Sequence, residues 1–186
     1  MKQTLINILD KALPKDPNFD RILEVTLSFE GGYTSRDEPT YKGITQRLYN
    51  AYAEQHGLEK KDVRKLTDRE IWEIYYNEFY LRPKLFILPY KIQGLVFDFG
   101  VNSGTGTAVR RLQGMIGTKV DGGVGDNTKK AVVAYLDKYG INNFVVNYNK
   151  QRKMVMQEAI VKHPEKKENW NGWMNRLNKL KTIYGA

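Results

Sequence analysis

Glu30 is the residue whose place in the sequence most strongly suggests chemistry. It ends an apolar stripe whose members recur every three or four residues and so share one face of a helix: Phe19, Ile22, Leu23, Thr26, Leu27 and Glu30. Gly31 and Gly32 follow directly, and glycine adopts the left-handed conformation that ends many helices without steric cost. Burial and the negative end of a helix dipole both disfavour a charged carboxyl group. The pattern therefore predicts a glutamate that donates a proton near neutral pH, with a solvated or salt-bridged glutamate as the alternative.

The rest of the composition excludes several other kinds of chemistry. The chain has no cysteine, so neither thiolate catalysis nor a disulfide is possible. Its two histidines, His56 and His163, lie in polar, charge-rich segments, and no P-loop, dinucleotide fingerprint or GxSxG motif is present. A metal site is therefore not expected, and neither is a bound cofactor. Carboxylates, tyrosines and threonines remain as the groups that can react.

The elements that must position these groups are almost all predicted to be helical. A chain of 186 residues can bury one core or two small, tightly packed lobes. Residues 44–57 and 67–82 carry apolar side chains in helical phase, and Thr67 with Glu70 makes a capping box at the start of the second segment. Residues 95–102 are apolar on nearly all sides. This favours a central buried helix, although a strand also fits so short a run.

The C-terminal half predicts long helices after a glycine-rich turn. Residues 121–128 offer too few acidic ligands for a calcium loop, so we expect a turn that caps the next helix. Helical stripes then run through residues 141–159 and 170–184. Trp170 and Trp173 belong to the last stripe and are expected to pack in the core.

The net charge of +9 calls for an anionic partner. The basic residues form small clusters along the chain, without a stripe of interleaved aromatics, so specific binding of nucleic acid is not expected. An anionic bacterial wall or outer-membrane face suits the same charge. No segment approaches the roughly 18 apolar residues of a membrane span. Residues 1–18 are amphipathic and lack the apolar centre of a signal peptide; we expect them to dock on the core, contact with a membrane being the alternative.

Four groups of motifs, in order along the chain, resemble glycoside hydrolase family 108, a group of bacterial and phage N-acetylmuramidases that hydrolyse peptidoglycan. The resemblance runs from about Phe19 to the C-terminus. Its motifs are Glu30-Gly31-Gly32-Tyr33 with Pro39-Thr40 and Gly43-Ile44-Thr45; Phe97 to Gly104 (FDFGVNSG); Arg111-Leu112-Gln113 with residues 120–122 and 125–128; and Asn171 to Arg176 (NGWMNR).

This resemblance implies a mainly α, lysozyme-like fold in a single compact unit with a peptidoglycan-binding C-terminal half. Residues 1–18 would be an N-terminal amphipathic extension, 19–104 the catalytic muramidase region, and 105–186 a helical peptidoglycan-binding-like region packed on it. The implied activity is cleavage of the β-1,4 bond between N-acetylmuramic acid and N-acetylglucosamine. We expect a monomer whose partner is the peptidoglycan glycan strand.

Within that expectation Glu30 is the general acid, and the second catalytic group is open. A two-carboxylate scheme favours Asp37, because the loop after Glu30 can fold it back across a cleft. Glu38 is the competing acid, and either can instead be solvated or paired. In the other scheme a threonine orients the attacking water, as in phage lysozymes of the related fold. Thr40 matches the family threonine, and Thr45 begins a helix that faces the same loop.

The same loop and the motif helix supply the expected sugar contacts. Tyr33, Glu38 and Asn102 are assigned to substrate binding, with structural hydrogen bonding as the competing role for Tyr33 and Asn102. The chain departs from the family between Tyr33 and Thr40, where members carry a longer acidic, glycine-containing stretch. The aspartate that usually follows the glutamate by about nine positions is absent, and Pro39 stands there.

Two other activities fit the same motifs. A lytic transglycosylase cuts the same bond with one acid and leaves an anhydro sugar, and a non-catalytic wall-binding or secretion-accessory protein could keep the fold without the chemistry. Small size, basic charge and the absence of a signal peptide favour a phage endolysin that is bacteriolytic. Such an enzyme is made in the bacterial host cytoplasm and acts on the cell wall, in the periplasm, after release.

Overall fold

Helix α5 (Tyr90–Ser103) lies at the centre of the protein in the computed structural model, which describes residues 16–35 and 38–185. Every residue from Ile92 to Gly100 is buried, because α2, α6, α7 and α8 all pack against this helix. The helical interpretation of residues 95–102 is therefore confirmed over the strand. Apolar side chains all round a helix indicate burial on every face, and that is what the structure shows.

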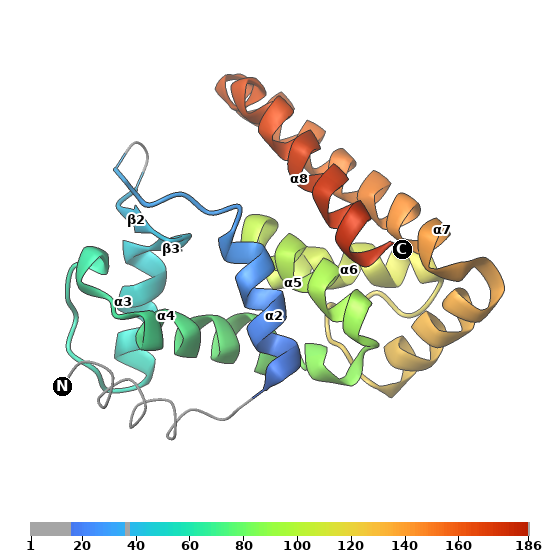
Figure 1. Ribbon diagram of the computed structural model, residues 1–186, viewed down its shortest axis with the longest axis horizontal. Helices are drawn as coiled ribbons and strands as arrows, with labels where there is room; N and C mark the ends of the chain where they lie inside the picture. The colour runs from blue at the N-terminus through green and yellow to red at the C-terminus, as the bar shows by residue number, and fades with distance from the viewer. Residues whose placement is uncertain (1–15, 36–37, 186) are drawn as a thin grey trace.

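The elements before α5 form the part of the molecule on the left in Figure 1. Asp16 caps the first of them, since its carboxylate accepts hydrogen bonds from the backbone N–H groups of Asn18 and Phe19. The predicted capping box of Thr67 and Glu70 is also present. The helical elements of this part are α2 (Pro17–Leu27), α3 (Gln46–Gln55), η1 (Val63–Lys65), α4 (Asp68–Ile74), the π-helical η2 (Tyr75–Leu81) and η3 (Leu85–Ile87).

A small antiparallel sheet, which the sequence did not predict, interrupts these helices. Its strands are β1 (Tyr33–Thr34), β2 (Thr40–Tyr41) and β3 (Ile44–Thr45), in that order. Lys42 and Gly43, with φ of 47° and 79°, join the last two, and two residues of positive φ make a tight hairpin. The expectation of a helix from residue 44 is wrong by two residues, because Ile44 belongs to the hairpin and Thr45 is the N-cap of α3.

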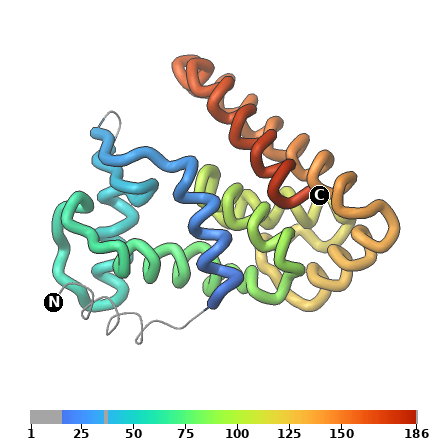
Figure 2. Tube along the Cα trace, in the orientation of Figure 1, coloured from blue at the N-terminus to red at the C-terminus, as the bar shows by residue number. Residues whose placement is uncertain are grey.

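The C-terminal half consists of α6 (Thr105–Ile116), α7 (Asp126–Lys162), the 3-10 segment η4 (Pro164–Asn169) and α8 (Trp170–Tyr184). Helix α7 is kinked at Gly140, where φ is 75°. Helices α7 and α8 lie side by side and project from the body as a hairpin, with η4 at its tip (Figures 1 and 2). Residues of η4 and of the short strands line the same cavity.

The glycine-rich segment before α7 is a turn, as predicted, and a buried glutamine organises it. Gln113 accepts hydrogen bonds from the backbone N–H groups of Asp121 and Gly122 and donates to the Gly123 carbonyl. The cap itself differs from expectation, since Gly125 precedes α7 and no side chain caps the helix.

One hydrophobic core joins the two halves of the chain. Its members come from α2, α5, α6, α7 and α8 alike, including Phe19, Phe97, Leu112, Phe144 and Leu180, each fully buried. The fold is thus mainly α, in a single unit with no layer of solvent between the halves. Within the described residues, no helix is long and apolar enough to cross a membrane.

Candidate active site

Glu30 lies on the loop that leaves α2, at the floor of a cleft. Four members of the predicted stripe, Phe19, Ile22, Leu23 and Thr26, are buried on α2, but the predicted place of Glu30 at the end of the helical stripe is wrong, because it lies three residues beyond the helix. The helix ends at Leu27, and the Glu30 N–H donates to the Leu27 carbonyl over 3.1 Å. This short turn holds the Glu30 side chain at the protein surface, where 17% of it is exposed.

The predicted role of the glycine pair is wrong. Gly31 and Gly32 do not adopt positive φ, and the helix ends before them, with Ser28 as a right-handed C-cap. A Cβ at either glycine would meet no atom within 4 Å. The glycine that does approach the candidate acid is Gly43 in the hairpin turn.

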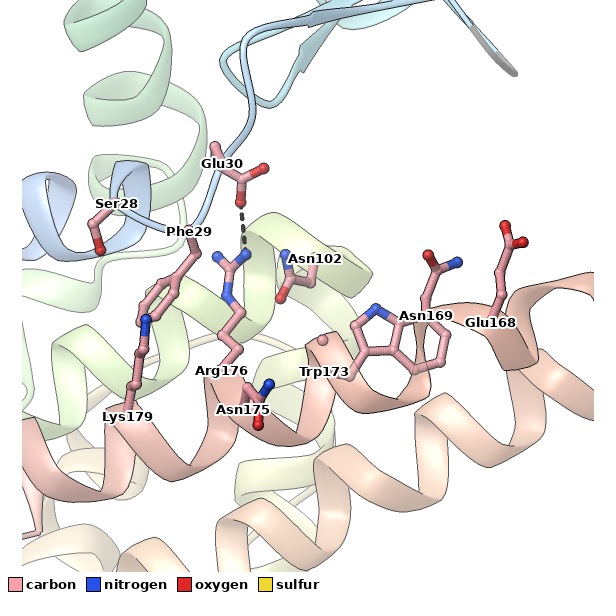
Figure 3. Close-up of a pocket in the computed structure, with 11 residues that line it drawn as sticks. Ser28, Phe29, Glu30, Asn102, Glu168, Asn169, Trp173, Asn175, Arg176 and Lys179 are labelled. Carbon is pink, nitrogen blue, oxygen red and sulfur yellow. Dashed lines mark hydrogen bonds and ion pairs between the residues drawn. The ribbon is translucent and has the colours of Figure 1, made fainter.

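Arg176, from the far end of the sequence, forms an ion pair with Glu30. Its Nη1 donates to Oε1 of Glu30 over 2.9 Å (Figure 3). Its Nε and Nη2 donate to Asp98 over 3.1 and 2.7 Å. Asp98 also accepts a 2.8 Å bond from Arg152, which is fully buried. Two carboxylates and two guanidinium groups thus form one buried charge network that spans the loop after α2, α5, α7 and α8.

The network keeps Asp98 ionised although it is out of contact with water. Burial acts to raise the pKa of Asp98, but the positive charges of Arg152 and Arg176 and their hydrogen bonds outweigh it and hold the pKa below its ordinary value. For Arg176, burial acts to lower the pKa, and the neighbouring Asp98 and Glu30 raise it above its ordinary value. Both groups are charged at neutral pH.

Two neighbouring cavities share part of their lining, and Glu30 lines one of them. The first, of about 610 Å³, is lined by Glu30 and Arg176 with Ser28, Phe29, Asn102, Glu168, Asn169, Gly172, Trp173, Asn175 and Lys179. The second, of about 680 Å³, is lined by Thr34, Glu38, Thr40, Thr45, Arg47, Asn102, Glu165, Lys166, Glu168 and Asn169. Asn102, Glu168 and Asn169 line both, so the two cavities adjoin, and the pair is called the cleft below. Each has the volume of an ordinary ligand pocket, and together they suit an extended chain-like ligand.

The predicted threonines lie together on the wall of the second cavity. Thr40 and Thr45 are directly opposed in the β2–β3 pairing. The Thr45 hydroxyl accepts the Leu48 N–H over 3.1 Å as the N-cap of α3, and the Thr40 hydroxyl donates to the Glu38 carbonyl over 2.9 Å. Each oxygen keeps a lone pair with which it can hold a water molecule.

The other predicted residues have different positions. The Glu38 carboxylate lines the second cavity and accepts the Arg47 N–H at the start of α3 over 2.7 Å. Asn102 lines both cavities and accepts from Arg152. Tyr33 lines neither cavity; its ring is 45% exposed and lies 5.1 Å from the Arg64 guanidinium group. Asp37 lies outside the described residues.

Sequence reasoning missed the wall that the C-terminal hairpin contributes. Trp173, expected in the core, is only half-buried and lines the first cavity with Asn175 and Lys179. Figure 3 shows Trp173 next to Asn169, across from Glu30 and Asn102. The available signal was the NGWMNR motif, whose tryptophan and arginine are three residues apart and therefore on one side of α8. In the described part of the chain, no group of histidine or acidic side chains is arranged to hold a metal ion.

Two family models match parts of this chain. Residues 23–104 match the family model of glycosyl hydrolase 108, and residues 107–178 match that of a predicted peptidoglycan domain. The chain is similar in structure to SagA of Brucella abortus, with a TM-score of 0.73 and 22% sequence identity over 90% of this chain and 94% of that chain. At that identity the likeness shows a shared fold. No curated protein matches the sequence significantly.

Proposed function

We propose that the chain is an N-acetylmuramidase. Its match to the family model of glycosyl hydrolase 108, with the match to a peptidoglycan domain, supports a glycoside hydrolase that acts on peptidoglycan. It would cleave the β-1,4 bond between N-acetylmuramic acid and N-acetylglucosamine. The observation that carries the proposal is the position of Glu30, a partly exposed carboxyl group that lines the first cavity of the cleft. The second cavity adjoins the first at Asn102, and we propose that a glycan strand binds with sugars in both.

In the proposed reaction Glu30 is the general acid. Its proton passes to the glycosidic oxygen, the bond from that oxygen to the anomeric carbon breaks, and the bonding electron pair remains on the departing sugar alcohol. The remaining sugar has oxocarbenium character and is captured by a water molecule, which loses its proton to a base. The products are two shorter glycans, one with a new reducing end.

The second group is proposed to come from the hairpin wall. Thr40 and Thr45 line the second cavity with hydroxyl oxygens that can orient the water, and Glu38 is the described carboxylate nearest to them along the chain. Asp37 remains the alternative for a two-carboxylate scheme. The variants Asp37→Asn and Thr45→Val separate the schemes, because only the group that activates water should reduce the rate of glycan hydrolysis when it is removed.

Replacement of Glu30 by glutamine tests the proposal. Glutamine keeps the shape of the side chain but has no titrating proton, so Glu30→Gln should clear purified peptidoglycan about 10²- to 10⁴-fold more slowly. Glu24→Gln, an exposed change on α2, is the matched control and should leave the rate unchanged. Clearance by Glu30→Gln at the wild-type rate would show that the catalytic assignment is wrong.

Mass spectrometry of the products decides between the rival reactions. A muramidase leaves reducing N-acetylmuramic acid ends, whereas a lytic transglycosylase leaves 1,6-anhydro ends. Reducing N-acetylglucosamine ends would instead show that the other glycosidic bond is cut. A protein that binds peptidoglycan and releases no fragments would be a non-catalytic wall-binding module.

We also propose that the protein acts as a monomeric endolysin, released from a host cytoplasm onto the cell wall. The net charge of +9 supports contact with an anionic envelope. Expression in bacteria, with and without a permeabilised inner membrane, tests this role. Lysis that depends on permeabilisation supports it, and lysis of intact cells at the same rate contradicts it.

A further inference from the structure

Arg176 joins the candidate acid to the centre of the protein, although 146 positions separate it from Glu30 in the sequence. The guanidinium group is planar and presents its N–H donors in a fixed fork. One edge, Nε and Nη2, is bound to Asp98, and Nη1 on the other side is bound to Glu30. The group also lies over the Phe29 ring at 4.8 Å. Only a tenth of the side chain is exposed.

The anchor for this arginine is rigid. Asp98 is fully buried in α5 and accepts further hydrogen bonds from Arg152 and from the Thr26 hydroxyl. Arg176 therefore cannot turn away from Glu30 without leaving a buried carboxylate short of its partners, which is costly in an apolar interior. The position of the Glu30 carboxyl group is consequently set by three elements, α2, α5 and α8.

The arrangement also distinguishes the two oxygens of Glu30. Arginine only donates hydrogen bonds. Oε1 of Glu30 accepts one from Nη1, so a proton on Oε1 could not point toward Nη1. The other oxygen, Oε2, lies next to Gly43, where a Cβ atom would come within 3.1 Å of it. The nearby Tyr75 hydroxyl does not compete for that oxygen, since it donates to the Lys42 carbonyl over 2.9 Å.

We infer that Arg176 is a positioning residue, which holds Oε1 and leaves Oε2 as the oxygen that delivers the proton to the glycosidic bond. This inference rests on the proposed function. When the proton leaves Oε2, the new negative charge on Glu30 is shared with Oε1 and is stabilised at once by the bound guanidinium group. The peptidoglycan domain region thus contributes to catalysis as well as to binding, because Arg176 belongs to residues 107–178.

The test uses four variants of the full chain. Arg176→Lys keeps the positive charge but has a single ammonium group, which cannot serve Asp98 and Glu30 with the geometry of a fork. Arg176→Gln removes the charge. Lys181→Gln, an exposed change on the same helix, controls for the loss of one positive charge, and Glu30→Gln reports on the acid itself.

The measurements are kcat and KM on soluble glycan strands, binding to sacculi and the melting temperature. We expect Arg176→Lys to lower kcat about 10- to 100-fold, since small misplacements of a catalytic group have effects of that size. KM and binding to sacculi should change less than threefold, and Lys181→Gln should match the wild type.

If Arg176→Gln does not fold, Arg176→Lys alone decides. A wild-type kcat in folded Arg176→Lys, or a fall in kcat fully explained by unfolded protein at the assay temperature, would overturn the inference. Wild-type activity of Glu30→Gln would instead overturn the proposed function, so the two failures are distinguishable.

Discussion

Gly43 lies next to the Glu30 carboxyl group, because a Cβ atom at this position would come within 3.1 Å of Oε2. Its φ of 79° strains any residue with a Cβ, and that atom would collide with the Tyr75 hydroxyl. We predict that Gly43→Ala lowers kcat/KM at least about tenfold, because the turn must shift and would displace Oε2 of Glu30. Steady-state rates on soluble glycan strands measure the effect.

A second glycine provides the control. Gly114 lies in α6, has no positive φ, and would place a Cβ in open space. Gly114→Ala should therefore leave the rate unchanged and raise stability slightly, by up to about 1 kcal/mol, because alanine favours the helix. Equal rates in both variants would show that the hairpin turn does not position the acid.

The candidate site was partly predictable at the scale of single residues. Glu30 could be found because a carboxylate at the end of an apolar helical stripe has no obvious structural reason to be there. Arg176 could not be assigned to it, since pairing across 146 positions depends on how α8 packs and leaves no periodic signal. Tyr33 shows the opposite error. It lies close to Glu30 in the sequence and was assigned to substrate binding, but it belongs to strand β1 and its ring packs against the Arg64 guanidinium group.

At the scale of elements, Asp98 links α5 to α7 and α8 through two arginines. Its pKa in the folded protein is lower than the roughly 3.9 of an unfolded aspartate, because the guanidinium charges outweigh burial. A carboxyl group whose pKa is lowered by folding stabilises the folded protein at pH values above its pKa in the unfolded chain. This stabilisation is lost as the pH falls through its pKa in the folded protein. We therefore predict that the free energy of unfolding falls as the pH is lowered below about 4.

The variant Asp98→Asn identifies this contribution. It leaves Arg152 buried without its carboxylate, so the free energy of unfolding at neutral pH should fall by about 3–5 kcal/mol. Its stability should also depend less on pH below about 4 than that of the wild type. Urea unfolding followed by circular dichroism at several pH values measures both, with the exposed Asp137→Asn as control. A wild-type acid profile in Asp98→Asn would assign the pH dependence to other carboxylates.

Element prediction succeeded where periodicity was long and failed where it was short. The central helix and the capping box followed from apolar pattern and local hydrogen bonding. The strands contain two residues each, too few for an alternating pattern, and their pairing depends on the turn at Lys42 and Gly43. Helix α8 shows a further limit of prediction from periodicity. Leu180, on its apolar face, is buried in the core, whereas Trp173 on the same stripe lines the cleft. The spacing of apolar residues does not show which end of a stripe other elements cover.

At the scale of the whole molecule, the cleft is formed by both halves of the chain. The short strands line the second cavity with Thr34, Thr40 and Thr45, η4 lines it with residues 165, 166, 168 and 169, and α5 contributes Asn102. Because the core is also shared, the matches to a hydrolase family and to a peptidoglycan domain describe two parts of one folded unit. The predicted boundary between residues 104 and 105 remains a prediction, since the structure shows no separate cores.

The distribution of positive charge leads to a last prediction. Away from the charge network the cleft is lined by three basic residues, Arg47, Lys166 and Lys179, and by three acidic ones, Glu38, Glu165 and Glu168, so the excess of positive charge belongs to the whole chain, at +9. Exposed charges such as these are screened by salt, with a Debye length that falls from about 10 Å at 0.1 M to about 3 Å at 1 M. Binding to peptidoglycan sacculi should therefore weaken steeply as salt rises. Hydrolysis of short, uncharged glycan fragments should change little, because the buried pair of Arg176 and Glu30 is screened much less.

Two sets of substitutions separate local from overall attraction. The double variant Lys166→Gln, Lys179→Gln removes two cleft charges, and Lys129→Gln, Lys130→Gln removes two from the exposed start of α7, outside the cleft. If the cleft binds the anionic strand, the first pair should weaken sacculus binding and flatten its salt dependence more than the second, since both change the net charge equally. Equal effects would indicate that only the overall charge of the protein attracts it to the wall. If binding of the wild type to sacculi did not depend on salt, neither the cleft charges nor the overall charge would contribute to binding.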